Sequence, residues 1–282
     1  MNLRAPFQYQ GGKHRFAPLI VPYLLGAASP GAHFIDAFSG SGSVTWALIN
    51  AGIEPNRITM IEGSIFGALW AALAADRFDL GAFLGEGEIL AAEHDRHKGG
   101  ALEYLKKRIA TVRTTSEAMT LLPYVQAATY GGRQAVFTEG QGFKGSLYPY
   151  RENRVSFAPW PEKVTARILA IAGAFRRLGG PLVVNATVTP GGLRDALNAF
   201  PGPAVAYLDP PYVGTAGYSH GFEWRDFLSA PVRCPVFVSE YAEAGHSIPL
   251  AETTKGGIQG GRLRVERLRV ERLNYFAAGS HL

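Results

Sequence analysis

The sequence predicts an α/β fold, in which short buried strands and helices are arranged around an open sheet. Two stretches carry this prediction. The first, from His33 to Ala51, has the pattern of an apolar strand, a Gly-x-Gly turn and an apolar helix, which is the opening β-loop-α unit of a nucleotide-binding sheet. The second is the apolar run Ala204–Leu208, a predicted strand that is followed by a carboxylate and two prolines. Because two prolines fix φ and remove two N–H donors, the strand must stop there, at the edge where open α/β sheets bind ligands.

The composition limits the classes of protein to which the chain can belong. Its 282 residues, 47% of them apolar, suffice for one large globular domain or for a domain with an insertion. The single cysteine, Cys234, excludes an internal disulfide framework and a cysteine-rich zinc site. No apolar run has the length of a membrane span, and residues 1–7 lack a secretory pattern, so we expect a cytoplasmic protein without membrane contact.

Positive charge is concentrated in one part of the chain. The net charge of +5 favours an anionic partner. Residues 131–180 contain eight basic and three acidic residues, so this segment alone has the same excess as the whole chain.

The N-terminal stretch Phe7-Gln8-Tyr9-Gln10-Gly11-Gly12-Lys13 combines paired glycines with a basic side chain. The two glycines allow a close backbone approach or a positive φ, although a flexible N-terminal arm is the alternative interpretation. The apolar segment 16–25 that follows predicts a helix, which Pro18 and Pro22 delay or bend.

The turn after the first strand, Phe38-Ser39-Gly40-Ser41-Gly42-Ser43, contains two glycines of the dinucleotide fingerprint, and Thr45 replaces the third. This favours a compact cofactor such as S-adenosylmethionine over one with a pyrophosphate. The next predicted strand, 57–61, ends at Glu62, which follows Gly40 by 22 residues. A carboxylate there can accept both ribose hydroxyls of an adenosine ligand, and a surface glutamate is the alternative.

The middle of the chain is helical at first and then polar. Apolar spacing predicts helices from Ser64 and around residues 84–94, 102–113 and 163–178. We interpret His94 and His97 as surface residues rather than metal ligands, because no further candidate ligands accompany them. From Tyr124 to Pro161, glycine, aromatic, amide and basic side chains alternate. Such side chains can contact phosphates and base edges, and a basic glycine-rich surface loop is the alternative.

The last third of the chain returns to the sheet. Strands at 181–186 and 235–239 and a helix at 192–200 are predicted. Residues 213–222, with three glycines, predict a mobile lid over the site. We expect the tandem repeat of five residues in 263–272 to form paired edge strands with charged outer faces.

Several of these motifs, in this order, resemble those of the Dam-like, alpha group of adenine-specific DNA methyltransferases. Residues 7–13 are similar to the family's N-terminal cofactor segment, and Phe38–Gly42 to its Phe-x-Gly-x-Gly loop. Glu62 matches the acidic residue after the second strand, and Asp209-Pro210-Pro211-Tyr212 matches the catalytic motif.

The resemblance implies a Rossmann-like class I methyltransferase fold, with a mixed seven-stranded sheet and a mainly helical, basic target-recognition insert. The S-adenosylmethionine-binding catalytic domain would comprise residues 1–75 and 180–282, and the insert residues 76–179. The implied reaction transfers a methyl group from S-adenosylmethionine to the exocyclic N6 of a flipped-out adenine in double-stranded DNA. The enzyme would act as a monomer on DNA without a metal, and the target sequence and a cognate restriction endonuclease stay open.

The resemblance also assigns roles to individual residues. Asp209 and the carbonyl of Pro210 would accept the two amine hydrogens, Pro211 would add rigidity, and Tyr212 would stack on the extruded base. The implied cofactor contacts are Tyr9, Gly11, Gly12, Lys13, Asp36, Phe38, Ser39, Gly40, Ser41, Gly42, Ser43, Glu62, Asn185 and Thr187. The implied DNA contacts are Arg133, Gln134, Lys144, Tyr148, Arg151, Asn153 and Arg154.

The chain departs from the family pattern at three places, and other functions compete. The family's Arg- and Asn-rich recognition segment is not reproduced cleanly, and only residues 131–134 and 148–154 are similar in kind. The family often has a lysine where this chain has Gln8, and it has an aspartate in the strand-end motif where this chain has Asn185 or Thr187 as neutral substitutes. One alternative is methylation of another planar amine, in RNA adenine or protein glutamine. Another is a catalytically inactive DNA-binding module of the same fold. The incomplete glycine fingerprint disfavours a nicotinamide oxidoreductase.

Overall fold

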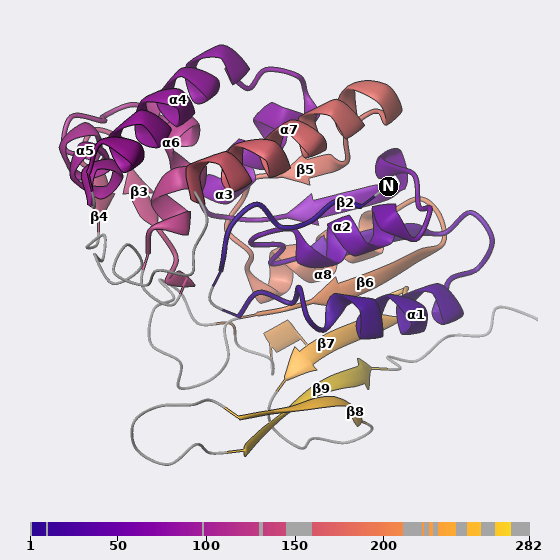
Figure 1. Cartoon of the computed structure of the whole chain (residues 1–282). Helices are drawn as coiled ribbons and strands as arrows, with labels where there is room; N and C mark the ends of the chain where they lie inside the picture. Colours follow the sequence, from indigo (N-terminus) through magenta and orange to yellow (C-terminus); the bar gives the residue numbers. More distant parts are fainter. Residues whose placement is uncertain are drawn as a thin grey trace, which may run out of the picture.

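The structure is a computed structural model that describes residues 2–9, 11–97, 99–129, 132–144, 160–210, 222, 226–227, 231–240, 247–254 and 263–271. Helices and strands alternate along these residues (Figure 1). In chain order they are α1 (Ala17–Ala27), β1 (His33–Ala37), α2 (Ser43–Asn50), the 3₁₀ turn η1 (Pro55–Arg57), β2 (Ile58–Ile61), α3 (Ile65–Ala74), α4 (Leu80–Arg96), α5 (Gly100–Ile109), α6 (Thr115–Ala127), β3 (Val136–Thr138), β4 (Gly142–Lys144), α7 (Trp160–Leu178), β5 (Leu182–Val184), α8 (Pro190–Ala199), β6 (Ala204–Leu208), β7 (Val236–Glu240), β8 (Ser247–Thr254) and β9 (Leu263–Glu271).

The main sheet is mostly parallel, and its strands follow the order β5-β2-β1-β6-β7-β9-β8. Strands β5, β2, β1, β6 and β7 run parallel, and β9 pairs antiparallel with both β7 and β8. From β1 the chain moves outward to β2 and β5, and it then returns to place β6 on the other side of β1. Such a reversal leaves a crevice at the carboxyl ends of β1 and β6, which is where open α/β sheets bind ligands.

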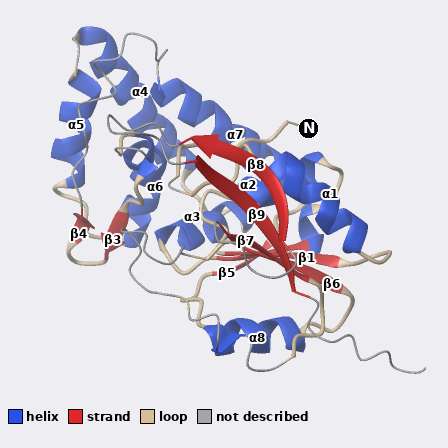
Figure 2. Cartoon of the chain, turned by 90° about the horizontal axis from the view of Figure 1, so that it is seen from below, coloured by secondary structure: helices blue, strands red, loops and turns tan. Residues whose placement is uncertain are grey.

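Helices cover both faces of the sheet, because successive side chains of a buried strand point to opposite faces. Phe34 and Tyr207 belong to one hydrophobic cluster with α1, α2, α3 and α7. Ile35 and Leu208 belong to a second cluster, with Leu197 of α8. Figure 2 shows α8 on the opposite side of the sheet from α1, α2 and α3. The sheet is therefore the middle of three layers.

Helices α4, α5 and α6 form a group at one end of the molecule, close to the hairpin of β3 and β4 (Figure 1). Within this group Tyr124 stacks on Phe83 with ring centroids 4.9 Å apart, and its hydroxyl hydrogen-bonds Oγ1 of Thr165 in α7 at 2.7 Å. These side chains belong to the same cluster as Trp46 and Phe175, which pack against the sheet. The hydrophobic core is thus continuous between the sheet and the helical residues of 76–179.

The predicted α/β class is confirmed, and the sheet is mostly parallel. Strand β6 has the predicted bounds, and most other predicted elements differ from the observed ones by a few residues at their ends. The expectation that a polar stretch begins at Tyr124 is wrong, because residues 124–127 are the buried last turn of α6. This helix begins at a capping box formed by Thr114 and Glu117, a start signal that the sequence displays.

The expected paired edge strands for the C-terminal repeat are also corrected. Nearly all of both copies lies in the single strand β9, which has a partner on each side, so it is interior, and β8 is the outer strand. Whether a strand is an edge depends on partners that are distant in sequence, which a local repeat does not reveal. Among the described residues, no helix combines the length and apolarity that crossing a membrane requires.

Candidate active site

The register of the sheet brings four predicted site positions to one level. Ala37 of β1 is paired with Ile61 of β2 and with Leu208 of β6, and Ile61 is paired with Val184 of β5. Each of these residues is the last of its strand. The next residue in each case, Phe38, Glu62, Asn185 and Asp209, therefore lies at the same carboxyl edge of the sheet.

Hydrogen bonds between the strand ends fix this arrangement. The N–H of Phe38 donates to the carbonyl of Ile61 at 2.9 Å, and the N–H of Asp209 donates to that of Ala37 at 3.3 Å. The first residues beyond β1, β2 and β6 are thus in direct contact with their neighbours. A ligand at this edge would meet all three segments together.

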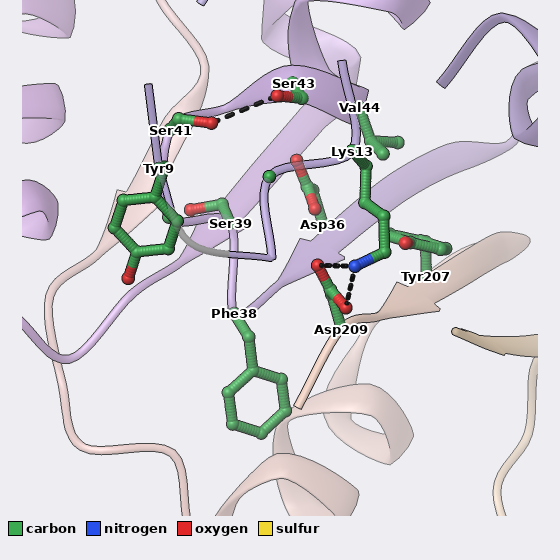
Figure 3. A pocket seen from close by; sticks show the side chains of 12 residues that line it. Tyr9, Lys13, Asp36, Phe38, Ser39, Ser41, Ser43, Val44, Tyr207 and Asp209 are labelled. Carbon is green, nitrogen blue, oxygen red and sulfur yellow. Dashed lines mark hydrogen bonds and ion pairs between the residues drawn. The ribbon is translucent and has the colours of Figure 1, made fainter. Parts of the chain in front are cut away.

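The most prominent pair in the site is Lys13 with Asp209 (Figure 3). Nζ of Lys13 lies 2.7 Å from Oδ1 and 2.8 Å from Oδ2 of Asp209, and it also donates to the carbonyl of Gly11 at 2.7 Å. Only 3% of the Lys13 side chain is exposed, against 17% of the Asp209 side chain. A lysine ammonium buried this deeply needs a carboxylate, since an unpaired buried charge costs several kcal/mol. The pair therefore holds the N-terminal segment against the end of β6.

The glycine loop between β1 and α2 has an unusual backbone that its neighbours hold in place. Phe38 has φ of 61°, a left-handed conformation that is rare for a residue with a side chain, and Gly40 and Gly42 also have positive φ. The indole N–H groups of Trp70 and Trp46 donate to the carbonyls of Gly40 and Ser41, each at 2.8 Å. Such strain persists where the surroundings over-determine it, and it occurs often at binding sites.

The two glycines of this loop are required by space as well as by φ. A Cβ atom on Gly40 would lie 2.8 Å from the Tyr9 ring, and one on Gly42 would lie 2.6 Å from the Trp46 ring. The Tyr9 ring itself packs edge-on against Phe66 at a centroid distance of 5.3 Å. The predicted N-terminal segment is therefore in contact with the predicted glycine loop.

Glu62 joins the second strand to the glycine loop. Its Oε2 accepts the N–H of Gly40 at 2.7 Å, and its Oε1 accepts the N–H of Ser64 at 3.0 Å, with 7% of the residue exposed. The carboxylate thus holds the backbone of the loop, a role that the sequence did not indicate. Each oxygen of a carboxylate keeps a further lone pair, so these bonds are compatible with the predicted ribose contact.

Asp36 is fully buried at the end of β1 and faces α2. Its Oδ2 accepts the backbone N–H of Thr45 at 3.1 Å and the hydroxyl of Thr45 at 2.6 Å. Burial raises the pKa of Asp36 to about 7; the two bonds from Thr45 oppose this rise, and the carboxylates of Asp209 and Glu62 add to it. Asp36, Asp209 and Lys13 all line the same pocket, so the ammonium of Lys13 offsets the charge of one of the two carboxylates there.

The pocket at the site has a polar floor that fits a bound ligand. It is lined by residues from the N-terminal segment, the glycine loop and the ends of β1 and β6, and Figure 3 shows their side chains. Among the described residues, Oγ of Ser39 is the buried side-chain oxygen or nitrogen that has no hydrogen-bond partner. Because leaving such a group unsatisfied costs about 1–3 kcal/mol, Ser39 is suited to bond a polar ligand atom. The volume of this pocket is about 20 Å³, so the observation supports a polar contact at Ser39 rather than space for a whole cofactor.

Asn185 and Thr187 are exposed residues that follow β5 beside Glu62. In the orientation that satisfies its surroundings, the amide nitrogen of Asn185 donates to the carbonyls of Glu62 at 3.0 Å and Ser64 at 3.2 Å. Glycine is needed at position 63, where a Cβ would lie 2.8 Å from Cα of Thr187. Both residues thus border the predicted adenosine end of the site.

Tyr207 and Val44 line the pocket and were not predicted. The Tyr207 hydroxyl hydrogen-bonds Oγ of Ser239 at 2.6 Å, which links β6 to β7 just before the catalytic motif. The position of Tyr207 two residues before Asp209 is the signal that could have identified it, since alternate strand residues share a face.

Pro210 directly follows Asp209, whereas Pro211, Tyr212 and most of the predicted lid lie outside the described residues.

The predicted DNA contacts are described in part. Arg133 and Lys144 are exposed and Gln134 is half-buried, near or within the hairpin of β3 and β4. Tyr148, Arg151, Asn153 and Arg154 lie outside the described residues.

Residue Gln126, which the sequence did not single out, connects this region to the N-terminal segment. Its fully buried amide nitrogen donates to the carbonyls of Gln8 (2.8 Å), Gly132 (3.0 Å) and Arg133 (3.1 Å), and its amide oxygen accepts the N–H of Ala135 at 2.8 Å.

Searches against models of known protein families and against curated protein sequences found no match to this chain. In the part of the chain that the structure describes, no group of three or more His, Cys, Asp or Glu side chains is arranged to hold a metal ion.

Proposed function

We propose that the protein is an S-adenosylmethionine-dependent DNA methyltransferase of the Rossmann-like class I type, which methylates the exocyclic N6 of adenine. The observation that carries this proposal is the common level of Phe38, Glu62 and Asp209 at the carboxyl edge of the parallel strands. The residues that the sequence analysis assigns to the cofactor, its ribose and the amine are thereby neighbours. The reversal of strand order at β1 and β6 supports a ligand at the same place.

The pocket residues fit S-adenosylmethionine by charge and by hydrogen bonding. Glu62 is suited to the ribose hydroxyls, and the glycine loop allows a ligand to approach its backbone. The unpartnered Ser39 hydroxyl and the acidic side chain of Asp36 suit the polar, positively charged end of the molecule. When bound, this cofactor supplies an electrophilic methyl group on a sulfonium.

Asp209 would act on the amine rather than on the cofactor. An aromatic amine is a poor nucleophile because its lone pair is delocalised into the ring. Hydrogen bonds from the amine to the Asp209 carboxylate and the Pro210 carbonyl would favour a tetrahedral nitrogen with its lone pair free for the methyl group. Lys13, by pairing with Asp209, would keep the carboxylate ionised and in a fixed orientation, so that it accepts a hydrogen bond. The amine proton leaves to solvent after the transfer.

The proposal is tested by incubating the protein with labelled S-adenosylmethionine and, separately, duplex DNA, RNA or protein. Label in the N6-methyladenine of the DNA is the expected result, and Asp209→Ala should abolish it. Asp195→Asn is the matched control, because Asp195 is an exposed carboxylate of α8. Label in RNA or protein would support the alternative amine substrates, and transfer that survives Asp209→Ala would contradict the assigned role. DNA binding without any transfer would indicate an inactive module.

The assignment of DNA as partner has its own test in the basic segment. The variant Arg151→Ala/Arg154→Ala should weaken duplex binding and reduce its salt dependence by roughly one unit per lost phosphate contact. An unchanged affinity at several salt concentrations would remove these two residues from the DNA-binding surface.

A further inference from the structure

A second and larger pocket lies next to the candidate active site. Its volume is about 630 Å³, and it is lined by residues 2–8, the region around the start of α1, one face of α2, the last residue of α6 and the first turns of α7. We call it the N-terminal pocket. Ser43 lines both this pocket and the one beside Asp209, so the two are adjacent. Its size is in the range of sites that hold a nucleotide-sized group.

The lining of the N-terminal pocket is positively charged. It includes Arg4, Lys163 and Arg167, together with His14, and among the described residues no acidic side chain lines it. None of these four side chains forms an ion pair with a carboxylate in the described residues. The charges of Arg4, Lys163 and Arg167 are therefore not neutralised within the described part of the protein.

Burial first, and then neighbouring cations, lower the pKa values of two groups in this pocket. Burial lowers the pKa of Arg167, and the neighbouring Arg4 lowers it further. The pKa of His14 is lowered by burial and then by Arg15 and Arg167. Cations gathered in this way are unfavourable to one another until an anion enters, so the pocket favours an anionic ligand.

The polar contacts in the pocket leave donors for such a ligand. One N–H of the Arg167 guanidinium donates to the carbonyl of Ala5 at 2.8 Å, which fixes the group at the edge of the pocket. Nε of Arg4 donates to Oδ1 of Asn2 at 3.3 Å. A guanidinium has five N–H donors, so both arginines keep several that can bind phosphate oxygens.

The position of the pocket favours a phosphate of a nucleic-acid strand. Lys13 points to Asp209, and the next side chain, His14, lines the N-terminal pocket. Lys163 and Arg167 lie in the first two turns of α7, which follows the predicted recognition residues 148–154 in the chain. The pocket is therefore linked, within a few residues, both to the proposed amine acceptor and to the proposed recognition segment.

We propose that the N-terminal pocket binds a backbone phosphate of the DNA strand that carries the target base. This inference rests on the proposed function, because it takes DNA as the partner. It adds a contact that lies outside the predicted recognition residues, and it contributes affinity and orientation rather than sequence discrimination.

The experiment compares duplex binding by fluorescence anisotropy at several salt concentrations. The test protein is Lys163→Gln/Arg167→Gln, and the control is Arg194→Gln/Arg233→Gln, which removes the same charge beside α8, outside the predicted recognition insert. We expect the test variant to lower the salt slope by about one to two and the affinity at 0.1 M salt by roughly 8- to 60-fold, since each phosphate contact contributes a slope of about 0.9. S-adenosylmethionine binding, measured by calorimetry, should be the same in all three proteins.

Other outcomes separate the sources of the phosphate and the two proposals. Equal slopes in the three proteins, or equal losses in the test and control variants, would overturn the inference. AMP serves as the probe for a free phosphorylated molecule. If AMP binds the wild type but not the test variant, and the DNA slope is unchanged, the pocket is a small-ligand site and the inference is wrong. If the test variant shows the expected change in salt slope but the wild-type protein transfers no methyl group, the phosphate-binding inference is supported and the proposed enzyme activity is contradicted.

Discussion

The substitution Asp36→Asn tests the electrostatics of the site most directly, because it removes a fully buried charge with little change of shape. Burial raises the pKa of Asp36 from 3.8 to about 7, even though two bonds from Thr45 stabilise the ionised form. A rise of about 3 units, at 1.36 kcal/mol each, makes ionised Asp36 cost about 4 kcal/mol of folding free energy. Asparagine can accept the same two bonds and pays no such cost.

The sign of the pH dependence follows from the two ionisation states. Between pH 4 and pH 7 the carboxyl is ionised in the unfolded chain and still protonated in the folded one, so the folded state binds more protons. The contribution of Asp36 to the free energy of unfolding therefore falls as pH rises through this window, and it is level above it. Relative to wild type, Asp36→Asn should gain little at pH 4.5 and up to about 4 kcal/mol at pH 8.

Urea denaturation followed by circular dichroism at pH 4.5, 6 and 8, at one ionic strength, measures this difference. Titrations of groups that do not interact with Asp36 cancel when the variant is compared with wild type. Asp195→Asn, an exposed carboxylate of α8, is the control and should show no comparable trend. If wild type and Asp36→Asn lose stability in parallel from pH 4.5 to 8, the burial argument for Asp36 is refuted.

Three further substitutions probe the contacts that assemble the site. Gly42→Ala should lower the free energy of unfolding by about 2–5 kcal/mol and weaken cofactor binding, because φ is +72° and a Cβ would lie 2.6 Å from the Trp46 ring. Equal urea midpoints for variant and wild type would contradict this. Lys13→Gln should lower the free energy of unfolding by about 1–3 kcal/mol, which is less than for a fully buried pair because 17% of the Asp209 side chain is exposed. In a double-mutant cycle, adding Asp209→Asn should recover part of this loss. Gln126→Leu should cost about 2–4 kcal/mol by leaving several buried backbone groups without partners, and a loss as small as that of an exposed substitution would show that water replaces the amide.

The fold class and the main strand ends could be predicted from local patterns. The apolar run Ala204–Leu208 stops at its two prolines because proline cannot continue a ladder, and the observed β6 has the same bounds. The glycines at 40 and 42 could be predicted for a similar reason, since few residues other than glycine adopt a positive φ. The interior place of β9 and the buried end of α6 could not, because both depend on partners that are distant in the chain.

The sequence by itself determined which residues carry the candidate chemistry. The glycine loop, Glu62 and Asp209 each follow a short apolar strand, and a local sequence pattern is enough to predict where such a strand ends. The tertiary structure decided that these three ends lie at one level, because strand register is fixed by pairing between β1, β2 and β6. It also decided the partner of Lys13. Nothing in the chain near residue 13 indicates a carboxylate 196 residues away, and the pair forms because the fold buries the ammonium beside the end of β6.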